Sequence, residues 1–196
     1  PRPPCLKPKA PPVLRPPPPV ATLTNYQSSA PYSGREAESS TTMHPANTAT
    51  PAKPPSRVIA SRVGDIEVPD ENFLTFPRGL LGFEGKSEYA ILNLPQEGME
   101  RFNLHQSADD PEAGFLVVEA SNVADALDPA DLHEAYNQCD VRPADALTLL
   151  IVAVRRNGEG IELTANLRAP VVIDATRRVG RQHVMSNGAY PIRFVL

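Results

Sequence analysis

The stretch Ala146-Leu147-Thr148-Leu149-Leu150-Ile151-Val152-Ala153-Val154 carries apolar side chains at both sets of alternating positions. Successive side chains of a strand point to opposite faces of its sheet, so this pattern predicts a strand that is covered on both faces. Such a strand lies in the middle of a core. The turn signal Asn157-Gly158-Glu159-Gly160 follows it and predicts an antiparallel return through Ile161–Ala165.

Shorter alternating runs surround this central strand, and Gly, Pro and Asp residues separate them. Arg57–Val68 changes the phase of its apolar positions at Gly64-Asp65, which predicts a two-residue hairpin turn at that pair. A second hairpin is predicted around Asp174–Arg178, between Pro170–Ile173 and Val179–Met185. The other predicted strands are Asn72–Phe76, Glu88–Leu94, Arg101–Gln106, Gly114–Glu119 and Ile192–Val195.

Pro129–Asn137 is the one helical candidate. Asp128 before it is a good N-cap, and proline is favoured at the first helical position. Leu132, Ala135 and Tyr136 recur at the spacing of an amphipathic helix. One short helix among about ten short strands predicts an all-β fold, a small antiparallel β-barrel-like or sandwich domain.

The amino-terminal part has a different composition, because 15 of the 23 prolines precede Ser56. Few large apolar residues accompany them, so residues 1–56 are predicted to be a disordered proline-rich tail. Residues 57–196 are predicted to form a single domain, of ordinary size for one core. The sequence does not begin with methionine, and we hypothesise that Met43 is the natural start and that residues 1–42 are not native.

Charge separates the same two parts. Six basic and two acidic residues precede Arg57, a balance of +4, and the whole chain carries −4, which leaves −8 on the domain. An acidic domain repels phosphate backbones and favours basic partners, so direct nucleic-acid binding is not expected. The basic doublets Arg155-Arg156 and Arg177-Arg178 are interpreted as solvated strand ends, since no aromatic residues interleave with them.

Cys5 and Cys139 are too few for a disulfide framework or a cysteine metal site, and we interpret both as reduced thiols of a cytoplasmic protein. No apolar run approaches the length of a membrane span. The sequence has no phosphate-cradling glycine loop and no nucleophile elbow. It therefore predicts a protein that is not an enzyme and has neither a cofactor nor a small-molecule substrate.

The nearest approach to a catalytic cluster is His105 with Asp109, Asp110 and Glu112. Imidazole and carboxylates can hold a divalent metal, so a small metal-dependent hydrolase is the alternative function. Asp109-Asp110-Pro111 also fits a turn between strands, with aspartate side chains bonded to local amides. We favour the turn, and predict no metal site and no catalytic residue.

The loop Phe76–Glu84 differs from the other connections because it combines glycines with large apolar side chains. Gly79 and Gly82 permit positive φ, and the proline after Phe76 stiffens the entry. Large apolar side chains in a loop either plug the end of a barrel or remain available to a partner, and the pattern leaves both open. These side chains are Leu80, Leu81 and Phe83.

Five motifs taken in order resemble the flagellar assembly factor FliW family, from about Arg57 to Leu196. They are Phe76-Pro77-x-Gly79-Leu80-x-Gly82-Phe83-Glu84, Gln106-Ser107-x-Asp109-Asp110-Pro111, Phe115–Val118, Thr164–Pro170 and Gly180-Arg181-Gln182. The resemblance implies a small β-barrel-like protein without catalysis. It implies binding to the translational repressor CsrA, which is thereby kept off flagellin messenger RNA, and to flagellin, so that flagellin translation is coupled to secretion.

The resemblance also implies which positions are functional. The protein is expected to be a monomer, and its acidic charge suits a basic RNA-binding partner such as CsrA. Asn166 could instead cap its own loop, and Arg168 could pair with Asp109 or Asp110 inside the fold; Leu81 stands where the family often has proline. The implied partner-binding candidates are Phe83, Glu84, Asp109, Asp110, Asn166, Leu167 and Arg168, and the implied structural positions are Gly79, Gly82 and Pro170.

Overall fold

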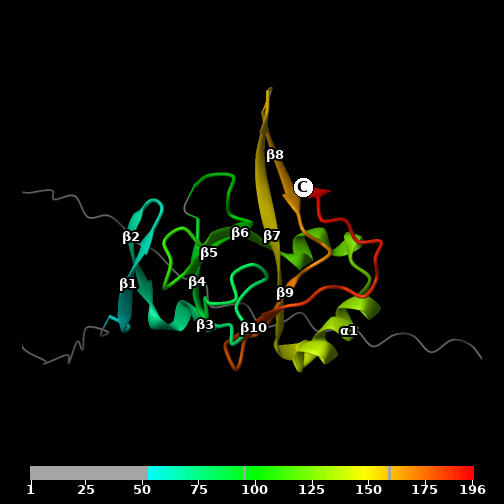
Figure 1. The fold of residues 1–196 in the computed structure, drawn as a ribbon, viewed down its shortest axis with the longest axis horizontal. Helices are drawn as coiled ribbons and strands as arrows, with labels where there is room; N and C mark the ends of the chain where they lie inside the picture. Colours follow the sequence, from blue (N-terminus) through cyan, green and yellow to red (C-terminus); the bar gives the residue numbers. More distant parts are fainter. Residues whose placement is uncertain (1–52, 95, 159) are drawn as a thin grey trace, which may run out of the picture. The chain divides into compact units, whose positions relative to one another are not determined.

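A computed structural model describes residues 53–94, 96–158 and 160–196, and Figure 1 shows their arrangement. The predicted disordered tail covers residues 1–56, and residues 1–52 lie outside the described ranges. The hypothesis about Met43 also concerns residues outside these ranges. Both stay predictions. The first strand begins at Ser56, one residue before the predicted start of the domain.

The described residues form eleven strands, and every predicted strand is present, most of them with shifts at one or both ends. The strands are β1 Ser56–Ser61, β2 Gly64–Pro69, β3 Phe73–Thr75, β4 Glu88–Asn93, β5 Phe102–Ser107, β6 Gly114–Glu119, β7 Ala146–Asn157, β8 Gly160–Ala165, β9 Val171–Asp174, β10 Val179–Gln182 and β11 Phe194–Val195.

The central strand β7 closes the main sheet into a barrel. It pairs with β6 through Leu149–Val152 and with β9 through Ala146–Leu149. Between these two neighbours the sheet runs β6-β5-β4-β3-β10-β9, so the strands form a ring. The single parallel pairing among the described residues joins Val179 of β10 to Thr75 of β3. The predicted β-barrel-like fold with one α-helix is therefore confirmed, with one parallel contact that the sequence did not indicate.

The outer half of β7 departs from the prediction. Thr148, Leu149 and Leu150 are buried, as expected for a central strand, but Val154 is 55% exposed. The pairing with β6 stops at Val152, and beyond that point only β8 accompanies β7. Residues 153–158 and 160–163 thus form an arm that projects from the barrel, as Figure 1 shows, so the expectation of two covered faces is wrong for this half.

Alternation along the strands separates the barrel interior from its outer layers. Leu74, Tyr89, Val117 and Leu149 point inward and pack together. Their chain neighbours point outward into other clusters: Phe73 and Ala90 pack under the β1–β2 hairpin, and Val118 and Leu150 pack under the segments that follow β6 and β8. At these positions the wall of the barrel is consequently apolar on both sides.

The β1–β2 hairpin is present, but its turn lies earlier than predicted. Ser61 pairs with Gly64, which leaves Arg62 and Val63 as the two turn residues in place of Gly64-Asp65. Gly64 has a φ of +114°, a conformation that glycine adopts without a steric penalty. Val63 is 86% exposed at the tip of the hairpin. The apolar positions change phase in the sequence because Val63 belongs to the turn and not to a strand.

The predicted helix is α1, Pro129–Cys139. Its N-cap Asp128 accepts a hydrogen bond from the Ala130 N–H at 2.7 Å, as expected for this residue type. The helix packs through Ala135 on Val172, the outward residue of β9. Among the described residues no helix is long and apolar enough to span a membrane. Short 3₁₀ segments that were not predicted are Asp70–Asn72, Ala120–Ala126 and Pro143–Asp145.

Candidate partner-binding face

The loop Phe76–Glu84 plugs the barrel and also presents apolar surface. Phe76 and Leu80 are buried and belong to the interior cluster. Leu81 is 54% exposed and Phe83 is 36% exposed. The sequence left open whether the apolar side chains of this loop plug the barrel or remain available to a partner. Phe76 and Leu80 plug the barrel, and Leu81 and Phe83 are exposed.

Two tight turns shape this loop. The Gly79 N–H donates to the carbonyl of Phe76 at 2.9 Å, and the Phe83 N–H donates to the carbonyl of Leu80 at 2.8 Å. Gly79 has a φ of +69°, and a Cβ there would lie 2.3 Å from the Phe83 carbonyl oxygen. Gly82 has a φ of +83° but has open space around it. Gly79 is thus required both for conformation and for space, and Gly82 only for conformation.

The exposed aromatic and acidic side chains of the loop are held by local contacts. The Phe83 ring meets Phe115 edge-on, with 4.9 Å between the ring centroids. The Glu84 carboxylate accepts a hydrogen bond from the Gly82 N–H at 3.0 Å. Bonds from the backbone N–H groups of Glu84 itself and of Gly82 lower the pKa of this carboxyl. A partner would therefore meet an ionised Glu84 in a defined position.

Gln182 at the end of β10 joins this loop to the loop that follows β8. Its Oε1 accepts from the Leu81 N–H at 3.0 Å, and its Nε2 donates to the Ala169 carbonyl at 3.0 Å. One side chain thus connects three of the five motifs. The role of Gln182 was not predicted, although this residue belongs to one of the motifs; the available signal was a polar residue at the end of an apolar strand.

The 166–170 loop is built mainly for structure. Asn166 accepts hydrogen bonds from the Arg168 and Ala169 N–H groups at 3.0 and 3.1 Å, so it caps its own loop. The structure places the candidate Leu167 in the core, 1% exposed, where it cannot contact a partner. Pro170 is buried as well.

Arg168 remains partly exposed, and one of its guanidinium N–H groups donates to the Asn187 carbonyl at 3.2 Å. In the described part of the chain it forms no ion pair with Asp109 or Asp110, so the proposed internal pairing is absent there. Arg168 instead holds the segment after β10 against the 166–170 loop. Its remaining N–H groups leave it a candidate for partner contact.

Asp109 and Asp110 lie in the predicted turn between β5 and β6. The Asp109 N–H donates to the Ser107 hydroxyl at 3.2 Å, and Asp110 accepts from the Glu112 N–H at 3.0 Å. Lys86 lies 3.3 Å from the Asp110 carboxylate. The Glu112 N–H, followed by the Lys86 ammonium, lowers the pKa of Asp110. Asp110 is therefore engaged within the fold, and Asp109 is exposed to solvent.

The alternative metal cluster is not assembled. His105 is 1% exposed and lies in the barrel, with its ring centroid 5.1 Å from Phe76 and 4.9 Å from Tyr89. Burial lowers its pKa to about 3, so the imidazole is neutral at physiological pH. Glu112 points outward and pairs with Arg62 at 3.4 Å. The described residues contain no group of three His, Cys, Asp or Glu side chains placed to hold a metal.

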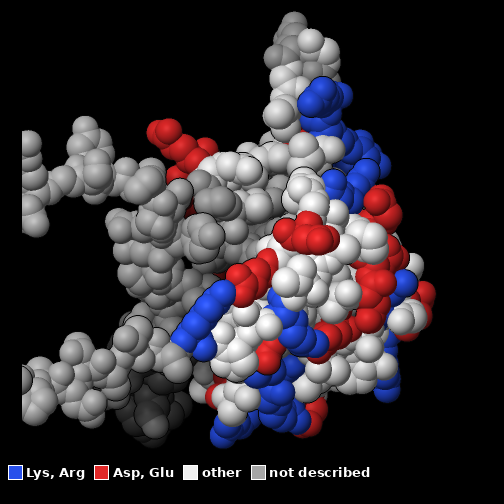
Figure 2. Space-filling view, turned by 90° about the vertical axis from the view of Figure 1, so that its left-hand side faces the viewer, with Lys and Arg blue, Asp and Glu red and all other residues white. Residues whose placement is uncertain are grey.

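Of the two basic doublets, only Arg155-Arg156 has the expected role of a solvated strand end. Arg177 bonds to Asp174 at 2.8 Å and to Asp140 at 3.1 Å. Arg178 donates to the Phe73 carbonyl, which lies 105 positions earlier in the chain. This pair stabilises the fold, and only Arg155-Arg156 on the arm is a solvated strand end. Figure 2 shows basic side chains on the projecting arm and acidic and basic side chains interspersed below it.

Comparisons with known proteins give a consistent result. A model of the FliW protein family matches residues 57–196. A flagellar assembly factor FliW of Syntrophus aciditrophicus is 32% identical over 139 residues, which cover 70% of this chain and 85% of the relative. A flagellar assembly factor FliW of Moorella thermoacetica is 34% identical over 143 residues, covering 71% and 87%. A crystal structure of the flagellar assembly factor FliW superposes with a TM-score of 0.57 at 27% identity and covers 71% of this chain and 96% of that one.

The family model covers more than half of the chain, and it begins close to the first strand of the described fold. Three of the five motifs that it spans are joined by the hydrogen bonds of Gln182. The chain therefore belongs to the FliW family of flagellar assembly factors.

Proposed function

We propose that this protein acts in the cytoplasm as a non-enzymatic assembly factor that binds the translational repressor CsrA and also binds flagellin. Exchange between the two partners couples flagellin translation to secretion. The observation that carries this proposal is the Phe76–Glu84 loop, a family motif that exposes Leu81 and Phe83 while its base is fixed in the core.

A rigid base makes the exposed side chains suitable for binding. Leu80 anchors the loop inside the barrel, and Gln182 holds the backbone of Leu81. Ordering a loop during association costs free energy, and a loop that is already ordered avoids that cost. Exposed apolar and aromatic side chains on such a loop are typical anchors of protein interfaces.

Charge supports a basic partner. The domain carries −8 by sequence, and the ionised Glu84 lies three residues from Leu81. A repressor that binds RNA presents basic residues, and opposite charge speeds association and orients the encounter. The same acidic surface, placed beside the RNA-binding face of the repressor, would repel the phosphate backbone.

The alternative of a metal-dependent hydrolase has little support in the described residues. Its imidazole, His105, is neutral and enclosed by aromatic rings, and Asp110 is engaged by Lys86 and a backbone N–H. The binding role is tested by co-purification of the full chain with the CsrA and the flagellin of the same cell. Retention of either partner at micromolar concentration is expected; retention of neither overturns the proposed function.

A further inference from the structure

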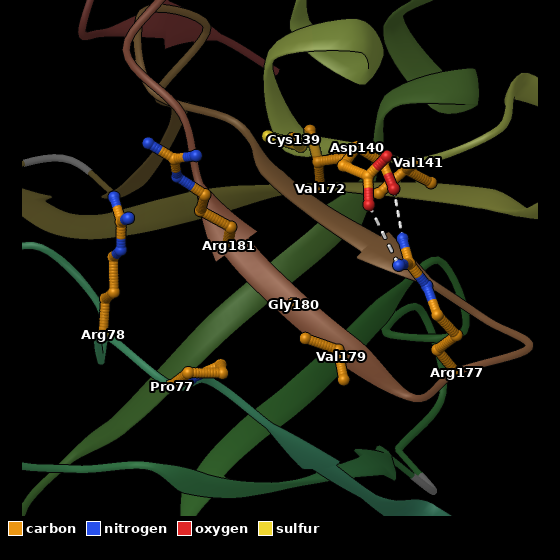
Figure 3. A pocket seen from close by; sticks show the side chains of 10 residues that line it. All are labelled: Pro77, Arg78, Cys139, Asp140, Val141, Val172, Arg177, Val179, Gly180 and Arg181. Atoms are coloured by element: carbon orange, nitrogen blue, oxygen red, sulfur yellow. Dashed lines mark hydrogen bonds and ion pairs between the residues drawn. The ribbon is translucent and has the colours of Figure 1, made fainter.

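A small pocket beside β10 has no role in the face described above. Its volume is about 210 Å³, and Figure 3 shows the side chains that line it. Val141 and Val172 form a buried apolar floor, and Val179 and Pro77 extend it toward the rim. Gly180 contributes no side chain, so the strand backbone itself forms part of the wall.

Two arginines at the rim are available to a ligand. Among the described residues Arg78 makes no hydrogen bond and no ion pair, and Arg181 donates one N–H to the Gln138 carbonyl at 3.2 Å. Figure 3 shows both guanidinium groups on the same side of the pocket. An arginine carries five N–H donors, so this side retains most of its hydrogen-bonding capacity and two positive charges without a paired carboxylate.

Arg177 on the opposite side of the pocket behaves differently. Its guanidinium is shared between Asp174 and Asp140, and it also donates to the Asp140 carbonyl. These contacts satisfy Arg177 within the fold and fix that wall. The contrast identifies Arg78 and Arg181 as the groups that would recognise an anion.

The size of the pocket limits what can enter it. Sites for drug-sized ligands and cofactors usually enclose about 300–1,000 Å³. A pocket of about 210 Å³ accommodates one or two amino-acid side chains. The apolar floor favours an aliphatic group, and the two unpaired arginines favour a planar anion that both can bond.

We propose that this pocket binds an extended segment of a partner protein in which a carboxylate side chain adjoins an aliphatic one. The carboxylate bonds to Arg78 and Arg181, and the aliphatic side chain packs on Pro77 and Val179, which are the exposed apolar residues of the lining. The proposal does not depend on which protein carries the segment, so it can fail while the proposed function holds, and the reverse.

Cys139 in the wall of the pocket provides a direct readout. It is partly buried, burial raises the pKa of its thiol, and the nearby Arg181 charge opposes that rise. The chain contains two cysteines, so Cys5→Ser leaves Cys139 as the only thiol in the full chain. An occupied pocket covers this thiol and slows its reaction with a disulfide reagent such as dithionitrobenzoate.

The probe is the dipeptide acetyl-Leu-Glu-amide, and its matched control is acetyl-Leu-Gln-amide. A ligand this small is expected to bind with a Kd on the order of 1 mM. At about 10 mM it then slows the Cys139 reaction roughly tenfold, by the factor one plus the ratio of concentration to Kd. Arg78→Gln or Arg181→Gln is expected to weaken binding about tenfold, so that slowing falls to roughly twofold. Arg155→Gln on the distant arm removes the same charge and keeps the full effect.

Four results with the peptides would overturn the proposal. They are no slowing by the glutamate dipeptide, equal slowing by the glutamine dipeptide, unchanged slowing in both arginine variants, and stronger slowing by acetyl-Leu-phosphoserine-amide, which would identify a phosphate site. Sodium acetate at the same concentration serves as the further control. Slowing by acetate equal to that by the dipeptide would show an unspecific anion effect and also counts against the proposal.

Discussion

The side-chain oxygen of Gln182 accepts a hydrogen bond from the backbone N–H of Leu81 at 3.0 Å, across 101 positions of sequence. The same side chain donates to the Ala169 carbonyl at 3.0 Å. The loop that exposes Leu81 and the loop that follows β8 are therefore held by one residue of β10. The relative position of the two loops depends on these two hydrogen bonds, because no strand pairing in the described sheet joins one loop to the other.

Gln182→Ala tests whether these two hydrogen bonds hold the loops in place. We expect it to lower the free energy of unfolding by roughly 1 kcal/mol, since two hydrogen bonds to backbone groups are lost. Hydrogen exchange at the Leu81 amide should become faster than in the parent chain, as measured by mass spectrometry. Gln96→Ala removes an exposed glutamine as the matched control. Unchanged exchange at Leu81 would show that the loop is held by other contacts.

Leu80 and Leu81 are adjacent, but they are expected to respond oppositely. Leu80 is 2% exposed, so Leu80→Ala should cost about 2–5 kcal/mol of stability. Leu81 is 54% exposed, and Leu81→Ala should change stability by less than about 0.5 kcal/mol. Denaturant titration measures both. Similar losses in the two variants would contradict the division of the loop into a plug and a surface.

Phe83→Ala is a less selective probe than the sequence indicated. The resemblance implied only that Phe83 is a partner-binding candidate. Because Phe83 packs edge-on against Phe115, we expect a stability loss of about 1–2 kcal/mol besides any effect on binding. The double variant Phe83→Ala with Phe115→Ala should show less than additive losses. Strict additivity would mean that the rings do not interact.

Gly79 and Gly82 make a second matched pair. Alanine at Gly79 requires positive φ and also places Cβ 2.3 Å from the Phe83 carbonyl oxygen, so we expect a loss above about 2 kcal/mol. Alanine at Gly82 has open space and should cost about 1 kcal/mol. Thermal unfolding of the two variants measures the difference. A cost at Gly82 equal to that at Gly79 would contradict the close approach at Gly79.

His105 makes stability depend on pH. Its folded pKa of about 3 lies below the ordinary 6.5, so the unfolded chain binds the extra proton as pH falls through 6.5. The native state then loses roughly 2–3 kcal/mol between about pH 7.5 and 4.5. His105→Phe should remove this part of the pH dependence, because phenylalanine fits an aromatic site and cannot be protonated.

Urea titrations at several pH values test the His105 prediction. Carboxylates titrate equally in parent and variant, so the difference between the two curves isolates His105. His133→Gln removes an exposed imidazole from α1 and serves as the matched control. Identical pH dependence in the parent and in His105→Phe would contradict the neutral buried histidine.

The fold was largely predictable because its elements follow local patterns. The limits of β6 and the N-cap Asp128 match the prediction, since alternation and capping depend on neighbouring residues. The ring of strands could not be predicted, because it includes the pairing of Val179 in β10 with Thr75 in β3, 104 positions earlier in the chain. The exposed outer half of β7 was missed for a related reason: Val154 would be covered only if β6 were longer.

The candidate site was predictable only in outline. The motifs identified the correct loops, but they could not distinguish buried Leu80 and Leu167 from exposed Leu81. These leucines have the same chemistry, and turn geometry decides which of them faces the core. The roles of Gln182 and Arg178 required the structure, since each bonds to a backbone group about a hundred positions away.

The central claim is that the exposed Leu81 surface binds the partners. Leu81 and Val154 are apolar and 54% and 55% exposed, so Leu81→Asp and Val154→Asp are closely matched changes at two distant sites. Calorimetric titration of the full chain and both variants with CsrA and with flagellin is the most direct test. We predict micromolar or tighter binding by the parent and by Val154→Asp, and a loss of about tenfold or more for at least one partner in Leu81→Asp. Unchanged binding of both partners by Leu81→Asp, or no binding by the parent chain, would contradict the claim.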